Sequence, residues 1–206
     1  MLVSAHGGPI PRGAALRAAL AGVPPRDRDA WVDRALGLDE PPDDGPALPS
    51  GGVPYLPSPV DALLRLTEHA PVRASDVFVD VGAGAGRAAA LVHLLTGASV
   101  VGLEIQPALV TAARALAARV DLPGVSFVEG DAPRLTAALT TGSVFFLYCP
   151  FSGERLARLL ANLEPVARTR EIRVGCLDLP LPPCPWLHPM PPLWPDLALY
   201  RSTLAA

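Results

Sequence analysis

Lysine is absent from this chain of 206 residues. All 17 basic residues are arginines, and they are spread from Arg12 to Arg201 without a dense cluster. Together with 20 acidic residues they give a formal net charge of −3. Proteins that bind DNA or RNA usually gather positive charge on one face. The charge distribution therefore gives no support to a nucleic-acid partner.

Cysteine is scarce as well. The three cysteines are odd in number and show no CxxC spacing, which argues against a disulfide framework and against a zinc site. The four histidines are scattered, and none lies at a metal-ligand spacing from another histidine or from a cysteine. We therefore expect no bound metal and a reducing, cytoplasmic compartment.

The sequence also lacks an apolar run of membrane-spanning length, and its N-terminus lacks the arrangement of a signal peptide. We expect a soluble protein that does not insert into a membrane. Half of the residues are apolar and 18% are charged, which is typical of a globular protein. The length suits one doubly wound α/β domain.

Residues 1–58 are expected to form an N-terminal extension, and residues 59–206 the main domain. Two short amphipathic helical patterns lie within residues 12–38. Proline and glycine then crowd residues 39–59, which excludes regular helix and sheet and predicts an extended connector. The extension is interpreted as a helical cap or lid.

Strand and helix patterns alternate regularly after Pro59. Buried strands are predicted at 77–81, 99–104, 126–129 and 144–149, and helical patterns at 60–69, 87–95, 108–120 and 134–139 come before or between them. Such alternation indicates βαβ units and a mostly parallel, doubly wound sheet with helices on both faces. A helix at 153–163 and a fifth strand at 171–177 follow. A last strand at 197–202 is expected to run antiparallel at the sheet edge.

A glycine-rich loop, Asp80-Val81-Gly82-Ala83-Gly84-Ala85-Gly86-Arg87, stands where the first strand ends and a helix begins. Glycines there permit a tight turn and a close approach of the backbone to a ligand. The helix that follows offers unpaired N–H groups to an anion. A dinucleotide, through its pyrophosphate, and S-adenosylmethionine, through its methionine carboxylate, both suit such a loop.

The spacing favours S-adenosylmethionine. A dinucleotide fingerprint requires GxGxxG, and counting from Gly82 places Arg87 at the third glycine. Asp80 adds a carboxylate that would repel a pyrophosphate but attract the methionine amino group. An NAD(P)-dependent oxidoreductase is kept as the alternative.

Two further acidic residues follow the next two strands. Glu104 ends the second strand, followed by Ile105, and its carboxylate can accept both ribose hydroxyls of either cofactor. Asp131 follows the third strand, where it can accept from the adenine amino group while the N–H of Ala132 faces the ring. Three carboxylates thus stand at three consecutive strand ends.

These motifs resemble those of the class I, seven-strand and Rossmann-like, S-adenosylmethionine-dependent methyltransferases, over roughly residues 59–151. The resemblance implies S-adenosylmethionine as cofactor, S-adenosylhomocysteine as product, and no metal. It places the loop on the methionine part, Glu104 on the ribose and Asp131 on the adenine. The implied cofactor-binding residues are Asp80, Gly82, Ala83, Gly84, Gly86, Arg87, Glu104, Ile105, Asp131 and Ala132.

Two segments bear on the methyl acceptor. The fourth strand ends in Tyr148-Cys149-Pro150-Phe151, which is similar to the Asn/Asp-Pro-Pro-Tyr signature of amino-group methyltransferases in its Pro-aromatic pair. It departs from that signature at Tyr148 and Cys149. Tyr55-Leu56-Pro57-Ser58-Pro59 is similar to the Tyr-x-Pro-Thr-Pro of seven-strand protein-lysine methyltransferases of the ATP synthase subunit c type. That family usually has an acidic residue where this chain has Ala85.

The sequence therefore predicts methylation of an amino group, with protein lysine as the first choice and a small-molecule acceptor as the second. The expected acceptor-side residues are Tyr55, Tyr148, Pro150 and Phe151, whose apolar, aromatic mouth would lower the pKa of an amine by desolvation. A binding module that keeps the cofactor site without activity is a further alternative.

Overall fold

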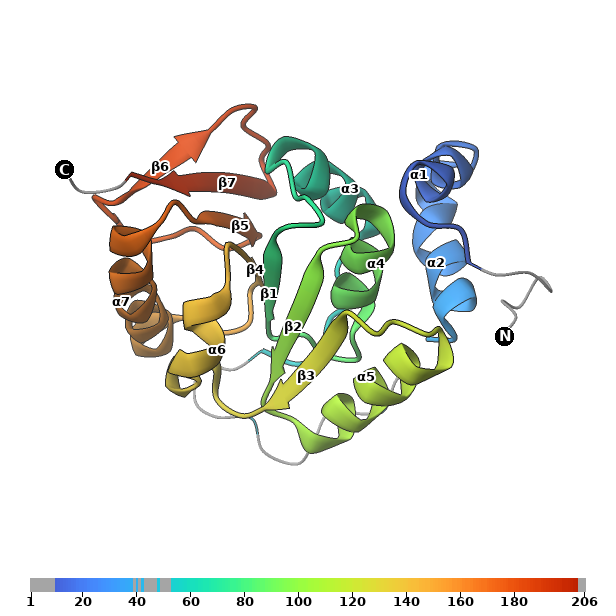
Figure 1. The fold of residues 1–206 in the computed structure, drawn as a ribbon, viewed down its shortest axis with the longest axis horizontal. Coiled ribbons are helices and arrows are strands. Elements are labelled where there is room, and N and C mark those ends of the chain that lie inside the picture. Colours follow the sequence, from blue (N-terminus) through green and yellow to red (C-terminus); the bar gives the residue numbers. More distant parts are fainter. Residues whose placement is uncertain (1–9, 39, 41, 43–47, 49–52, 204–206) are drawn as a thin grey trace.

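The protein is built on one seven-stranded sheet with the strand order β3-β2-β1-β4-β5-β7-β6 (Figure 1). The structure is a computed structural model, and it describes residues 10–38, 40, 42, 48 and 53–203. Much of the predicted connector at 39–59 therefore lies outside the described residues. The strands are β1 (Val77–Val81), β2 (Ser99–Glu104), β3 (Val125–Glu129), β4 (Val144–Tyr148), β5 (Arg173–Leu177), β6 (Leu187–Met190) and β7 (Leu197–Ser202).

The first five strands are parallel, which confirms the predicted doubly wound α/β fold. β1 pairs with β2 on one side and β4 on the other, so Asp80 stands beside Gly102 and Phe146. β3 extends the sheet beyond β2, and β5 extends it beyond β4. The carboxyl ends of these strands consequently meet at one edge of the sheet.

Helices cover both faces of the sheet (Figure 1). One apolar core joins α3 (Val60–His69), α4 (Arg87–Thr96) and α5 (Pro107–Arg119) to Phe78 and Phe146 of the sheet. The opposite core joins α6 (Thr136–Thr141) and α7 (Gly153–Thr169) to alternate residues of the same strands, such as Val79 and Phe145. Both faces of the central strands are therefore buried. No helix in the described part of the chain is long and apolar enough to cross a membrane.

The last strand, β7, runs antiparallel to β5 as predicted, and a strand that the sequence analysis missed lies outside it. This strand, β6, occupies part of the proline-rich segment 180–195, and its Pro189 pairs with Tyr200 of β7. Proline cannot donate a hydrogen bond to a sheet, but an edge strand has one side without a partner strand. β6 therefore forms the edge at which β7 was expected.

The N-terminal helices α1 (Gly13–Ala21) and α2 (Arg28–Leu36) pack beside α3 and α4 and share their apolar core through Leu16, Leu20, Val32 and Leu36. Arg87, the first residue of α4, binds α2 through two carboxylates. Its guanidinium, on a side chain only 4% exposed, binds Asp33 and Asp29 of α2 and donates to the Ser58 carbonyl at 3.0 Å. Division of the chain at residue 58 stays a prediction.

Replacement of Arg87 by methionine is expected to lower the free energy of unfolding by about 3 kcal/mol, because it leaves the carboxylate of Asp33 without its buried partner. Chemical denaturation measures this change. Arg158→Met is the matched control, since Arg158 makes an exposed pair with Glu154 on α7, and its loss should cost less than about 1 kcal/mol. Equal losses in the two variants would contradict the assignment.

Candidate cofactor site

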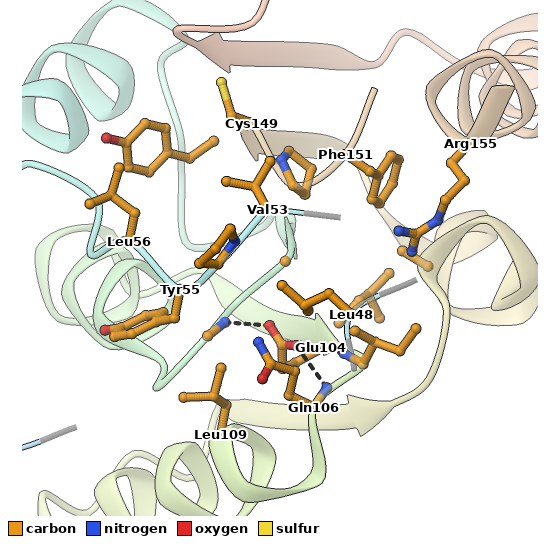
Figure 2. A pocket seen from close by; sticks show the side chains of 18 of the residues that line it. Leu48, Val53, Tyr55, Leu56, Glu104, Gln106, Leu109, Cys149, Phe151 and Arg155 are labelled. Atoms are coloured by element: carbon orange, nitrogen blue, oxygen red, sulfur yellow. Dashed lines mark hydrogen bonds between the residues drawn. The ribbon is translucent and has the colours of Figure 1, made fainter. Parts of the chain in front are cut away.

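A cavity of about 700 Å³, including its open side, lies at the carboxyl edge of the sheet (Figure 2). The ends of β2 and β4 and the segments that follow β1, β2, β3 and β4 form its base and walls. Val53, Pro54, Tyr55 and Leu56, from the later part of the connector, complete the lining. The cavity thus stands where the sequence predicted convergence of the strand ends.

The glycine loop forms part of the cavity wall with backbone atoms, because Gly82 and Gly84 have no side chains. Gly82 and Gly84 both have left-handed backbone angles, with φ of 82° and 54°. The Gly82 and Ala83 N–H groups donate to the Leu103 carbonyl at 2.8 and 3.0 Å, which fixes the loop to β2. A Cβ on Gly84 would stand 2.2 Å from the ring of Tyr55. Only glycine fits this position.

Glu104 holds the loop and the end of its own strand together. One carboxylate oxygen accepts from the Gly84 N–H at 2.9 Å, and the other accepts from Ile105 and Gln106 at 2.7 and 2.8 Å (Figure 2). The side chain is buried, yet it lines the cavity. A carboxylate offers about four acceptor positions, so capacity remains for a hydroxyl of a ligand.

Asp80 lies behind the loop and is only 3% exposed. It accepts a hydrogen bond from the Ala89 N–H in the first turn of α4. Its Oδ2 has no hydrogen-bond partner among the described residues. Burial, and after it the charge of Glu104, raise the pKa of Asp80 to about 7. A cation placed near this carboxylate would relieve both effects.

Asp131 is bound by an arginine that the sequence analysis missed. Arg155 of α7 donates to Asp131 at 2.6 Å, and its guanidinium carbon lies 4.5 Å from the centre of the Phe151 ring. The Arg155 Nε is buried and has no partner among the described residues. Arg155 lines the cavity beside Phe151 (Figure 2). Its link to Asp131 spans 24 residues of sequence, and no local motif indicated it.

The predicted acceptor-side residues all line the cavity: Tyr55, Tyr148, Pro150 and Phe151. Burial raises the pKa of Tyr55 to about 12, although the nearby charge of Arg87 acts in the opposite direction. Burial also raises the pKa of Tyr148, and the charge of Asp178 adds to the shift. Both phenols therefore keep their protons at neutral pH.

The predicted cofactor-binding residues divide into two groups. Those that line the cavity are Gly82, Gly84, Glu104, Ile105 and Ala132. Those that do not line it are Asp80, Ala83, Gly86, Arg87 and Asp131. Arg87 faces α2, as described above, and Gly86 faces the ring of Phe127 and Ala113. Lining residues that the sequence analysis did not single out include Gln106, Leu109, Gly130 and Arg155.

Comparison with known proteins bears on the identity of the ligand. Residues 78–169 match the family model described as a methyltransferase domain. A search of curated proteins finds no match. Among solved structures, an RNA methyltransferase from Salinibacter ruber in complex with S-adenosyl-L-homocysteine is 26% identical, with a TM-score of 0.53 over 72% of this chain and 94% of the other.

Two further structures are similar. The putative methyltransferase yhhF from Escherichia coli is 19% identical, with a TM-score of 0.58 over 77% of this chain and 92% of the other, and it supports the fold alone. A protein solved in work on conversion of a disulfide bond into a thioacetal group during echinomycin biosynthesis is 28% identical. That match has a TM-score of 0.50 and covers 60% of this chain and 51% of the other.

The domain match, the S-adenosylhomocysteine complex of a similar protein and the seven-stranded sheet agree with one another. S-adenosylmethionine is the cofactor that they indicate, and the reaction is transfer of its methyl group. The chain is a class I S-adenosylmethionine-dependent methyltransferase.

Proposed function

We propose that the enzyme methylates an amino group, with the cofactor in the cavity beside Gly84 and the acceptor approaching past Phe151. The observation that supports this proposal is that one cavity is lined both by Glu104 and by the aromatic residues at the end of β4. Glu104 stands at one side of it, and the aromatic tip of β4 stands at the other. A nucleoside and a reacting methyl group thus have separate places.

The residues of the cavity fit S-adenosylmethionine, which supplies an electrophilic methyl group on a sulfonium when bound. Glu104 has acceptor capacity left for a ribose hydroxyl. Asp80 does not line the cavity, but its buried carboxylate has one oxygen without a partner among the described residues, and its charge would favour a nearby ammonium. The left-handed Gly82 and Gly84 let backbone approach the ligand without a Cβ in between. We assign the methionine part to this loop.

The adenine is assigned to the part of the cavity that Ala132 and Arg155 line. Arg155 holds one oxygen of Asp131. In the described part of the chain, the other oxygen has only a longer contact, 3.6 Å, with the exposed Arg134. That second oxygen is our candidate acceptor for the adenine amino group, whose position would then be set indirectly by Arg155.

The acceptor side excludes water and aligns the nucleophile, which is the enzyme's main task in an in-line displacement. An amine must first lose a proton to solvent, and the apolar surroundings of Phe151 and Pro150 favour its neutral form. The nitrogen lone pair then forms the C–N bond while the C–S bond breaks and its electron pair stays on sulfur. Tyr148 keeps its proton at neutral pH, so its hydroxyl is able to hold the amine by hydrogen bonding.

A nucleic-acid acceptor is a further candidate, because a similar structure is described as an RNA methyltransferase. The net charge of −3 and the spread of the arginines argue against an extended RNA partner. A small-molecule acceptor stays the second choice, as in the sequence analysis. Protein lysine remains our first choice, on the similarity of residues 55–59 to the lysine-methyltransferase motif.

Incubation with radiolabelled S-adenosylmethionine and separate pools of protein, RNA and small amines tests the acceptor. We expect label in protein, released on hydrolysis as methylated lysine. Label in RNA, or in free amines alone, would overturn the choice of acceptor. Cofactor binding without transfer to any pool would instead favour an inactive binding module, and tight binding of NAD(H) without S-adenosylhomocysteine would favour the oxidoreductase.

Replacement of Glu104 by glutamine is expected to weaken S-adenosylhomocysteine binding by about 1 to 3 kcal/mol, because the ribose loses a charged acceptor. Isothermal titration calorimetry measures the effect. Glu129→Gln is the matched control, since Glu129 is the exposed residue beside Glu104 on the neighbouring strand. Unchanged affinity in the Glu104 variant would place the ribose elsewhere.

Asp80→Asn should have opposite effects on stability and on binding. The folded-state pKa of Asp80, about 7, lies above its ordinary value of 3.8, so the wild-type protein loses stability as pH rises between these values. The asparagine variant lacks this penalty. Its gain in the free energy of unfolding should be absent below pH 4 and should grow as the pH rises to 7. Above pH 7 the gain should stay constant at about 2 to 4 kcal/mol.

Denaturation at a series of pH values measures this gain, and calorimetry should show weaker S-adenosylhomocysteine binding by the same variant at pH 8. Asp27→Asn serves as control, because Asp27 is exposed beside Arg26 and its removal should change stability little at any pH. A variant no more stable than wild type at pH 8 would show that the Asp80 charge is already compensated.

A further inference from the structure

A second hollow adjoins the cofactor cavity and has no role in the function described so far. It measures about 1110 Å³ including its open side. Val53, Cys149 and Phe151 line both hollows, so the two meet at the tip of β4. From there the second hollow extends along the start of α7 and the segment after β5. It therefore offers a route from the surface to the proposed methyl-transfer position.

The walls of this hollow are apolar apart from one charge. Leu156 and Ala157 of α7 face Leu179 and Leu181. Prolines 180 and 182 complete that side. Among the described residues that line it, the single charged side chain belongs to Asp178, which is exposed. The hollow thus combines an apolar surface with one negative charge.

The position of Asp178 is fixed by unusual backbone geometry. Cys149 and Asp178, at the ends of the adjacent strands β4 and β5, both have left-handed backbone angles, with φ of 40° and 49°. The Cys149 thiol donates to the Asp178 carbonyl at 2.6 Å, and the Asp178 N–H donates to the Asp196 carbonyl at 2.7 Å. Non-glycine residues in this conformation are uncommon and concentrate at functional sites.

We infer that this hollow is the acceptor groove, and that it takes a lysine side chain of a polypeptide, with the stem against Leu156 and Leu181 and the ammonium at Asp178. The inference rests on the proposed function, because it names the acceptor of the same cavity. Lysine combines a flexible apolar stem with a compact positive charge. The groove presents the complementary pair of features.

The groove also discriminates between the acceptors considered above. Asp178 would repel the phosphates of RNA, and no arginine or histidine among the described lining residues offers them a partner. The open side leaves room for the chain that carries the lysine. Asp178 acts here in binding and orientation and is not a proton acceptor in the transfer. Near Phe151 the surroundings are apolar, so the amine gives up its proton to solvent before it attacks the methyl carbon.

Paired peptides test the inference. An array of lysine peptides, each beside the same peptide with norleucine in place of lysine, is incubated with the full-length protein and saturating S-adenosylhomocysteine, and retention is measured without turnover. The wild-type protein should favour lysine over norleucine by about fivefold at its best sites, as expected for one partly exposed ion pair. Asp178→Asn should abolish this preference, and Asp178→Glu should keep most of it.

Leu181→Ala is the matched variant for the apolar wall, and it should weaken retention of both members of a pair alike. Calorimetry with S-adenosylhomocysteine verifies that each variant is folded, because neither Asp178 nor Leu181 lines the cofactor cavity. Failure of the wild-type protein to bind S-adenosylhomocysteine would contradict the proposed function itself.

Three results would overturn the acceptor groove while leaving the cofactor site intact. The first is a lysine preference that survives in Asp178→Asn. The second is equal retention of lysine and norleucine peptides by the wild-type protein. The third is binding of free n-pentylamine, dependent on Asp178, without retention of any peptide, which would identify a small amine as the occupant.

Discussion

The carboxylate of Glu104 is the point on which the geometry of the cofactor site depends. It accepts from Gly84, Ile105 and Gln106, and so connects the loop after β1 to the end of β2. A buried carboxylate without such partners would be strongly destabilising. The three hydrogen bonds therefore hold the loop against the end of β2, where its glycines form a wall of the cavity. The same side chain remains accessible from that cavity.

The charges around this point are left unbalanced by the protein. Asp80 and Glu104 are both buried, and the pKa of Asp80 is raised first by its burial and then by the charge of Glu104. The nearby arginine, Arg87, is occupied by Asp33 and Asp29 of the N-terminal helices. The positive charge of Arg87 therefore does not neutralise Asp80 and Glu104. It binds the N-terminal extension instead. The proposed ammonium group of the cofactor would supply the positive charge that the fold does not place there.

The sequence predicted most of the sheet because its buried strands are short apolar runs set between helical patterns. Its failure at β6 has a physical reason: proline is excluded from central strands, but Pro189 is accommodated at the sheet edge. The glycine loop and Glu104 were found because strand ends are visible in the pattern. Contacts between distant segments were not visible. Hence the contacts of Arg87 with α2 were not foreseen, and Arg155 was missed on a helix whose spacing indicates only packing.

Arg155 shows why a site of this kind is more than a set of strand-end motifs. The sequence analysis assigned Asp131 to the adenine and Phe151 to the acceptor, as if the two were independent. The Arg155 guanidinium binds Asp131 and lies over the ring of Phe151. Its position is set by α7, which packs on the sheet through Leu159 and Leu163. The helix thereby fixes Asp131 relative to Phe151, and an in-line transfer depends on such fixed positions of the groups around the reactants.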